Sequence, residues 1–325
     1  MNQKFITGNA VAANTPSPLR RTLAAFAPLL ACLLLLSATG CATHGYKLVW
    51  HDEFNHNGPP NPANWNYEHG FARNHEWQWY QPENAVCTNG LLVIEARRER
   101  RPNPDYSAGS QDWRTSRQEI ECTSASLTSR GLQAFTYGKF EMRARIDPRL
   151  GSWPAFWTLG DTPGIHWPAC GEVDIMEFYT GTVLANFGYG LDHKTKWSAV
   201  KKPIADWGGK AWAGKFHIWT MEWDPQKIDL LLDGRLMNHL DLASADQADG
   251  GNPFHRPVYM ILNQAIGGDC GGDPSLTEFP VRFEVDWVRV YALPGSGGGL
   301  LLDRAHGRRA HRTVRDPPPL SRPGR

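Results

Sequence analysis

Several features that define other protein classes are missing from this sequence of 325 residues. Its longest apolar run, residues 23–36, falls short of the ~20 residues that a membrane-spanning helix needs. No two cysteines have the CxxC spacing of a zinc cluster, and the chain shows no internal repeat. These absences exclude a polytopic membrane protein and argue against a zinc-cluster module or a repeat array.

The central part of the sequence also lacks a surplus of basic residues. The net charge of the whole chain is +1, but the first 40 residues are basic without any acid, and residues 301–325 hold seven arginines against two aspartates. The residues between them are therefore acidic overall, which argues against nucleic acid as a partner, since phosphates require a basic face. We interpret residues 293–325, with their GSGGG run and many prolines and arginines, as a disordered tail.

Tryptophan, in contrast, is abundant. All 14 tryptophans lie between Trp50 and Trp287, and hydrophobic residues make up 41% of the chain. A tail or a linker would not carry them, so we assign them to one folded unit with a substantial core, which excludes disorder throughout. Composition alone leaves open whether these side chains fill the core or form a binding surface.

The N-terminal segment, residues 1–41, is typical of an export signal. Arg20 and Arg21 precede the apolar run, whose length fits a secretory signal. The run ends in ATGC at 38–41, which resembles the lipoprotein box whose cysteine, here Cys41, is lipidated; ordinary cleavage beside an incidental Cys41 is the alternative. We expect a bacterial lipoprotein at the outer membrane or cell surface, attached only through its lipid, or otherwise a periplasmic or secreted protein.

Four cysteines remain in the exported part, and an even number in an oxidising compartment predicts two disulfides. Three pairings are possible, and free buried thiols are the alternative. The favoured pairs are Cys87–Cys122 and Cys170–Cys270.

The body of the chain is typical of an all-β protein. Short alternating runs recur between turns rich in glycine, proline, asparagine and aspartate, and few segments have a helical pattern. A body of this size with this many strands favours two large packed sheets of jelly-roll type. We interpret the polar residues 97–119 as a long loop. The expected strands are 91–96, 124–129, 138–146, 216–223, 227–234, 257–266 and 282–291.

Residues 171–178, GEVDIMEF, place three carboxylates on one apolar strand. Side chains alternate along a strand, so Glu172 and Asp174 share a face, whereas Glu177 would point to the other. One β-bulge near Ile175–Met176 would return Glu177 to the first face. The sequence therefore predicts a bulged strand with three acids in a row.

Such a row suits the cleavage of a glycosidic bond. Neighbouring carboxylates resist joint ionisation, and a retaining glycosidase needs one ionised nucleophile and one protonated acid. A solvated edge strand and a calcium site are the structural alternatives. The apolar residues between the acids argue against the solvated edge.

The motif resembles the active-site signature of glycoside hydrolase family sixteen in its bulged form. GSWPAFWTLG at 151–160 is similar to the strand that precedes the signature in that family, and LVWHDEF, FHIWTMEWDPQKIDLLLDG, ILNQAIGGDCGG and FEVDWVRVY follow the family order. The resemblance covers residues 46–292. It implies a curved antiparallel β-jelly-roll sandwich of the concanavalin A type, with an open substrate cleft on its concave face.

The resemblance also implies residue roles. Glu172 is the expected nucleophile and Glu177 the expected general acid/base, with Asp174 between them positioning the nucleophile. Catalysis needs no cofactor, and we expect a monomer. The tryptophans at 219, 223 and 287 are assigned to the core. The implied sugar-binding residues are Trp153, Trp157, Trp167 and Asn84, and the implied ligands of a structural calcium are Glu53, Gly90 and Asp286.

Two positions depart from the laminarinase pattern within the family. Ser126 stands where those members commonly carry arginine, and Gly188 stands where they often carry histidine. The leading prediction is a retaining endo-glycosidase acting on β-1,3-glucan. A hydrolase of agar- or carrageenan-type galactan, a transglycosylase, and a non-catalytic glycan-binding module of the same fold remain alternatives.

Overall fold

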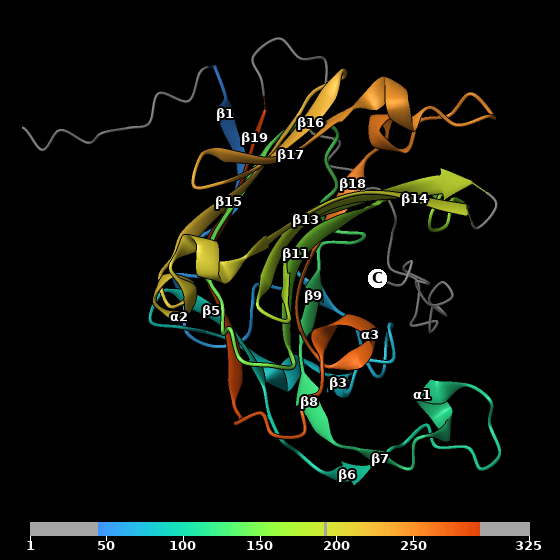
Figure 1. Ribbon diagram of the computed structural model, residues 1–325, viewed down its shortest axis with the longest axis vertical. Helices are drawn as coiled ribbons and strands as arrows, with labels where there is room; N and C mark the ends of the chain where they lie inside the picture. The colour runs from blue at the N-terminus through green and yellow to red at the C-terminus, as the bar shows by residue number, and fades with distance from the viewer. Residues whose placement is uncertain (1–44, 192–193, 293–325) are drawn as a thin grey trace, which may run out of the picture. The chain divides into compact units, whose positions relative to one another are not determined.

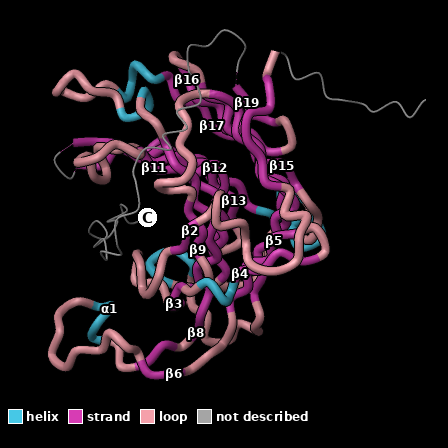
Figure 2. The backbone as a smooth tube through the Cα atoms, turned by 180° about the vertical axis from the view of Figure 1, so that it is seen from behind, coloured by secondary structure: helices cyan, strands magenta, loops and turns pink. Residues whose placement is uncertain are grey.

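The computed structural model describes residues 45–191 and 194–292. The predicted export signal with Cys41 and the predicted tail from residue 293 lie outside these residues. Strands dominate the described part, joined by loops with short helices (Figure 1, Figure 2).

One antiparallel sheet has eight strands. Seven of them follow the order β17-β16-β15-β10-β19-β5-β4, and β1 pairs with the long strand β19. Alternation in the sequence explains them: in LLVIEA, every second side chain is buried. The strands are β1 (Lys47–Asp52), β4 (Ala85–Thr88), β5 (Leu91–Ala96), β10 (Gly138–Arg145), β15 (His217–Trp223), β16 (Lys227–Leu232), β17 (Arg235–Asp241) and β19 (Val281–Ala292).

The second antiparallel sheet has seven strands in the order β14-β13-β12-β11-β18-β9-β2. Its three central strands are buried on both faces along nearly their whole length, including the acids of β12. The strands are β2 (Asn66–Tyr67), β9 (Ser126–Thr128), β11 (Ser152–Gly160), β12 (Glu172–Tyr179), β13 (Thr182–Leu191), β14 (Lys194–Pro203) and β18 (Val258–Ile266).

The loops contain short strands, short helices and 3₁₀ turns. Two further strand pairs form, β3 (Gln78–Tyr80) with β8 (Cys122–Ser124) and β6 (Arg101–Pro102) with β7 (Glu119–Ile120). Within the described ranges, no helix is long and apolar enough to span a membrane. The helices are α1 (Trp113–Ser116), α2 (Gly209–Ala213) and α3 (Gly268–Gly271), with 3₁₀ turns η1 (Pro82–Asn84), η2 (Ile204–Trp207), η3 (Leu242–Ala245) and η4 (Pro253–His255).

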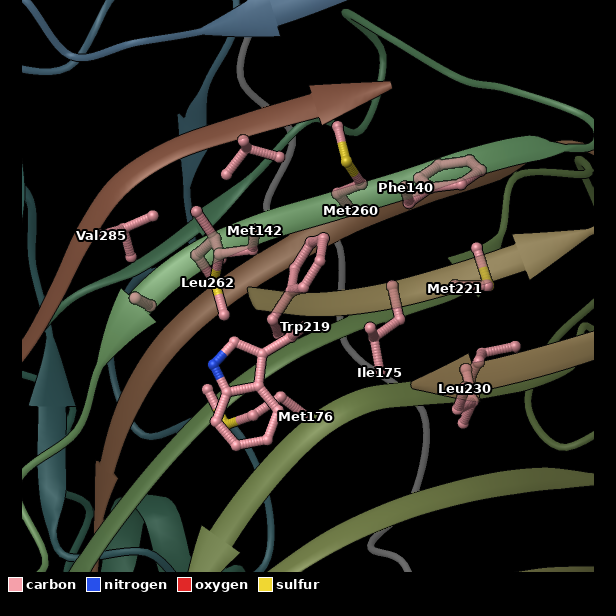
Figure 3. Close-up of a cluster of buried hydrophobic side chains, with 14 of the residues drawn as sticks. Phe140, Met142, Ile175, Met176, Trp219, Met221, Leu230, Met260, Leu262 and Val285 are labelled. Atoms are coloured by element: carbon pink, nitrogen blue, oxygen red, sulfur yellow. The ribbon is translucent and has the colours of Figure 1, made fainter. Parts of the chain in front are cut away.

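The main core lies between the two large sheets, where their apolar faces meet. Figure 3 shows side chains from β10, β15, β16 and β19 meeting those from β12 and β18. Burial of this apolar surface is the dominant stabilising contribution, at about 25 cal/mol per Å². The labelled residues are Phe140, Met142, Ile175, Met176, Trp219, Met221, Leu230, Met260, Leu262 and Val285.

Two predictions about the loops and cysteines are corrected. Residues 97–119 contain β6, α1 and the start of β7 rather than a plain loop. Cys87, Cys122 and Cys170 are free cysteines, so neither the pair Cys87–Cys122 nor the pair Cys170–Cys270 forms. Cys87 packs in the main core and Cys122 in a separate cluster beside Ile266. Burial raises the pKa of both thiols to about 12, so they behave as small apolar side chains.

Candidate active site

Strand β12 carries the predicted bulge. Asp174 pairs with Asn186 on β13, but Glu177 pairs with Leu184, so one extra residue of β12 lies between these two pairs. The register with β11 shifts at the same point. The adjacent side chains of Ile175 and Met176 both enter the main core, as Figure 3 shows. The bulge therefore turns Glu177 to the same side as the other two acids.

All three acids line one pocket on the sheet face that points away from the main core. We call this surface the cleft face. Glu172, Asp174 and Glu177 are each no more than 3% exposed. The pocket is lined by these acids and by Arg73, Asn74, Glu76, Trp153, Ala155, Trp157 and Asn263.

Neutral donors hold the carboxylates in place. The indole Nε1 of Trp167 donates to Oε2 of Glu172 at 2.8 Å. The indole Nε1 of Trp153 donates to Oε1 of Glu177 at 3.0 Å. These two predicted sugar-binding tryptophans therefore touch the acids directly, and their N–H groups fix the carboxylate orientations.

Asn186 joins the other two acids. Its amide nitrogen donates to Oδ2 of Asp174 at 3.1 Å and to Oε2 of Glu177 at 2.9 Å. Sequence reasoning missed Asn186, although its place on β13 directly opposite Asp174 follows from the hairpin register. This shared donor holds the two carboxyl groups of Asp174 and Glu177 side by side in the pocket.

Trp157 faces the cleft, but another side chain covers its ring. The guanidinium of Arg73 lies over the indole at 5.0 Å from the ring centroid. The indole Nε1 donates to Asn263 at 2.8 Å. Trp157, implied by the resemblance as a sugar-binding residue, thus lines the pocket as a buried part of its wall, with Arg73 over its ring.

A fourth acid, Glu76, also borders the pocket. Its carboxylate accepts from Asn74 at 3.2 Å, from Gln78 at 2.7 Å and from the Tyr80 hydroxyl at 3.3 Å. Burial raises the pKa of Glu76 to about 7, against the lowering effects of Arg73 and of the hydrogen bonds from Gln78 and Asn74. No sequence pattern singled out Glu76, because it lies outside the signature strand.

The remaining predicted positions lie elsewhere. Asn84 is fully buried in η1, where its amide donates to the backbone oxygen of Glu95 and to Thr123, and it is not among the residues that line the pocket. Trp219 and Trp223 belong to the main core, as predicted. Trp287 is only partly buried and stacks on an arginine of the same strand, so its assignment to the core is wrong.

The structure explains both departures from the laminarinase pattern. A side chain at position 188 would collide with Trp197, because a Cβ there would lie 2.8 Å from the indole. Gly188 pairs with Glu172 of β12 on one side and with Trp197 of β14 on the other, so the indole occupies the space beside the glycine. Ser126 donates its hydroxyl to Glu68, which also holds Arg73. Neighbouring side chains thus fill both places.

Two of the three predicted calcium ligands, the carboxylates of Glu53 and Asp286, pair with arginines. Arg289 binds the Glu53 carboxylate through two nitrogens at 2.9 and 2.8 Å, and this bond lowers the pKa of Glu53. Arg143 pairs with the Asp286 carboxylate. Within residues 45–191 and 194–292, no group of three or more acidic, histidine or cysteine side chains is arranged to hold a metal. The acids at these positions pair with arginine instead.

Comparisons with known proteins agree with this geometry. The family model "Glycosyl hydrolases family 16" matches residues 71–289. A β-glucanase of Rhodothermus marinus is 33% identical, over 84% of this chain and 94% of the relative. A keratan-sulfate endo-1,4-β-galactosidase of Sphingobacterium multivorum is 30% identical over 80% of this chain, which spans 58% of that relative.

Among solved structures, the laminarinase catalytic domain of Thermotoga maritima has a TM-score of 0.64 at 33% identity, covering 76% of this chain and 98% of that domain. The strands, the bulge and the three acids agree with the jelly-roll fold and signature expected from the sequence. The chain belongs to glycosyl hydrolase family 16.

Proposed function

We propose that the protein is a retaining endo-β-1,3-glucanase that uses Glu172 as nucleophile and Glu177 as general acid/base. One observation carries the proposal: the bulge in β12 brings three carboxylates into one pocket lined by indoles and amides. The β-glucanase and laminarinase relatives support the reaction and the substrate class.

In the first step, a carboxylate oxygen of Glu172 attacks the anomeric carbon. The C–O bond to the leaving sugar breaks, and Glu177 gives its proton to that oxygen. Trp167 orients Glu172 for this attack through its N–H bond to Oε2. The product of this step is a covalent glycosyl-enzyme ester.

In the second step, Glu177, now ionised, takes a proton from water as the water attacks the same carbon. The ester bond to Glu172 breaks, and the sugar leaves with its original anomeric configuration. Trp153 and Asn186 hold the two oxygens of Glu177 in this state, because both donate to it. Asp174 shares the amide of Asn186 and so couples its own charge to that of the acid/base.

The test is to incubate the purified protein with laminarin and to follow both reducing ends and product length. Wild-type protein should release oligosaccharides of several lengths, with the β-anomer formed first in proton NMR spectra. Glu172→Gln should bind the polymer and release nothing while melting at the wild-type temperature. Wild-type protein that binds glucan without releasing reducing ends would instead be a glycan-binding module.

A β-linked galactan is the second candidate substrate. Ser126 and Gly188 depart from the laminarinase pattern, and the keratan-sulfate endo-1,4-β-galactosidase relative is similar over most of this chain. Parallel incubations with lichenan, agarose and carrageenan decide between the two. Faster release from a galactan than from laminarin would replace the glucanase assignment and leave the roles of the acids unchanged.

Export and lipid anchoring are part of the same proposal. They rest on the sequence of residues 1–41, where two arginines, an apolar run and Cys41 follow in the order of a lipoprotein signal. Metabolic labelling with a radioactive fatty acid should mark the wild-type chain and not Cys41→Ser. Equal labelling of both chains would contradict lipidation at Cys41.

A further inference from the structure

Arg73 is the cationic side chain among the residues that line the catalytic pocket. Its side chain is only 16% exposed, and its guanidinium carbon lies over the Trp157 ring at 5.0 Å from the ring centroid. One nitrogen, Nη1, is enclosed and meets no hydrogen-bond acceptor in the described part of the chain. A buried donor without an acceptor is costly, so its presence at the edge of a substrate pocket suggests a ligand acceptor.

Nearby carboxylates position the guanidinium of Arg73 and keep it protonated. Glu68 accepts from Nη2, and the hydroxyl of Ser126 donates to the second oxygen of Glu68. Burial alone would lower the pKa of Arg73, but Glu68 and Glu76 reverse this effect and raise the pKa, so the side chain stays charged. The guanidinium is therefore fixed on one edge by Glu68 and on one face by Trp157.

Hydrogen bonds from two other arginines fix the backbone on either side of Arg73. Arg114 of helix α1 donates twice to the backbone oxygen of Ala72, at 3.1 and 2.7 Å. Arg117 donates to the backbone oxygens of Glu76 at 2.7 Å and of His75 at 2.9 Å. The residues that follow β6 thus fasten the turn around Arg73 from outside the pocket, and Arg73 is preorganised before any sugar arrives.

From these contacts we infer that Arg73 is a substrate-binding residue, and that it donates to a hydroxyl or ring oxygen of an uncharged pyranose bound beside Glu172. This inference rests on the proposed glycosidase function and narrows its substrate class. Nη2 is bonded to Glu68, so Nη1, which meets no acceptor among the described residues, is the nitrogen that would donate to the sugar.

The surrounding charge selects a neutral sugar rather than an anionic one. Glu68 and Glu76 lie beside the guanidinium, and the three acids of β12 line the same pocket. A sulfate or carboxylate substituent at this place would meet more negative than positive charge, which disfavours its binding. A neutral hydroxyl gains a charge-assisted hydrogen bond without that repulsion.

The experiment compares initial rates on a neutral polymer and on a lightly sulfated preparation of the same polymer. Wild-type protein, Arg73→Gln, Arg73→Lys, Glu68→Gln and the outer control Arg145→Gln are measured on both, with melting temperatures recorded for each. Laminarin serves as the neutral polymer, or agarose if the galactan assignment holds. Retardation of each protein in a gel containing the neutral polymer measures binding independently of cleavage.

For Arg73→Gln, kcat/KM on the neutral polymer should fall roughly 10- to 100-fold, as loss of a charge-assisted bond predicts, with Arg73→Lys between it and wild type. Wild-type protein should cleave the sulfated polymer more slowly than the neutral one. In Glu68→Gln the ratio of sulfated to neutral rates should rise, because one compensating charge is gone. Arg145→Gln should match wild type in both rates.

Equal rates for wild type and Arg73→Gln, or equal cleavage of both polymers by wild type, would overturn the inference. A purely structural role would lower the melting temperature without changing the ratio of the two rates. Failure of the glycosidase proposal looks different, since wild type would release no reducing ends at all. In that event, retardation in the gel still tests whether Arg73 binds sugar. Loss of retardation in Arg73→Gln alone would support sugar binding by Arg73, and equal retardation of wild type and Arg73→Gln would contradict it.

Discussion

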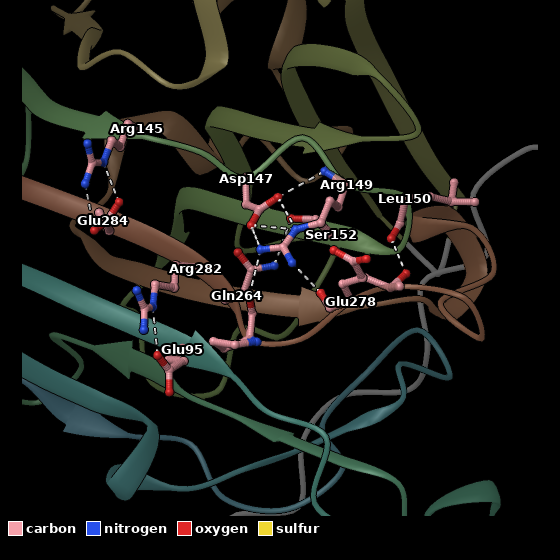
Figure 4. Close-up of polar contacts among 12 residues, drawn as sticks. Glu95, Arg145, Asp147, Arg149, Leu150, Ser152, Gln264, Glu278, Arg282 and Glu284 are labelled. Atoms are coloured by element: carbon pink, nitrogen blue, oxygen red, sulfur yellow. Dashed lines mark hydrogen bonds and ion pairs between the residues drawn. The ribbon is translucent and has the colours of Figure 1, made fainter. Parts of the chain in front are cut away.

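The cleft face of the seven-stranded sheet and the outward face of the eight-stranded sheet use the same acidic residues in opposite ways. On the outward face, acids pair with arginines across strands, as Arg145 with Glu284 and Arg282 with Glu95 at 2.8 Å (Figure 4). On the cleft face, neutral indoles and an amide donate hydrogen bonds to the acids of β12. The proposed acid/base chemistry uses the second arrangement.

The contrast follows from burial. The outward pairs are partly exposed, where water screens each charge and an ion pair contributes little. The acids of the cleft face are almost fully buried, so each change of charge there is felt by its neighbours. Acidic residues therefore contribute little to stability on the outward face, and they are the proposed reactive groups on the cleft face.

The largest expected effect comes from removing either catalytic acid in turn and supplying azide. In Glu172→Ala, azide should attack an aryl β-glycoside from the side of the missing carboxylate, and Glu177 protonates the departing phenol. The product should be the α-glycosyl azide. In Glu177→Ala, azide should instead open the ester with Glu172 and give the β-glycosyl azide. NMR of the products distinguishes the two anomers.

Both variants should be nearly inactive on polymer without azide, with Glu177→Ala losing about 10²–10⁴-fold in rate. The matched control is Glu284→Ala on the outward face, which should keep wild-type activity. Azide products of one configuration from both cleft variants would contradict the assigned roles.

A smaller effect is expected at Asn186, whose amide serves Asp174 and Glu177 together. In Asn186→Ala both acids lose this donor, and we expect kcat to fall roughly 10- to 100-fold, since a hydrogen bond to a charged group contributes about 1.5–3 kcal/mol. Asn238 is the matched control, because this buried amide donates only to backbone oxygens, those of Ala185 and Ser198. Asn238→Ala should lower the melting temperature and leave kcat unchanged. An unchanged kcat in Asn186→Ala, with a loss of kcat in Asn238→Ala, would contradict the role of Asn186 in the site.

The site could be predicted from the sequence as far as local spacing determines it. Glu172 and Glu177 are five positions apart, a spacing that requires a bulge if both serve one pocket, and the register of β12 contains that bulge. Arg73 could not be found this way, because its place depends on a turn fixed by arginines some 40 residues further along the chain. The cysteines failed for a related reason: an even count says nothing about which hydrophobic cluster encloses each thiol.

Glu76 offers a test through pH rather than activity. Burial raises the pKa of Glu76 from 4.5 to about 7 in the folded protein. Between these values the unfolded chain releases its proton while the folded chain keeps it, so stability falls as the pH rises. The free energy of unfolding should therefore decline more steeply from pH 5 to 8 in wild type than in Glu76→Gln, by on the order of a few kcal/mol. Thermal and urea unfolding measure this free energy at each pH. The same pH dependence in wild type and Glu76→Gln would contradict the raised pKa of Glu76.

The smallest effect is expected on the outward face, where Arg145 and Glu284 pair across β10 and β19. Arg145→Gln, Glu284→Gln and the double variant form a thermodynamic cycle, and its coupling energy should be below about 1 kcal/mol because both side chains are partly exposed. Raising the salt concentration should shrink it further. None of the three variants should alter kcat. A coupling energy of several kcal/mol would contradict the small contribution of the outward ion pair to stability. A loss of kcat would show that charges on the outward face affect the acids of the cleft face.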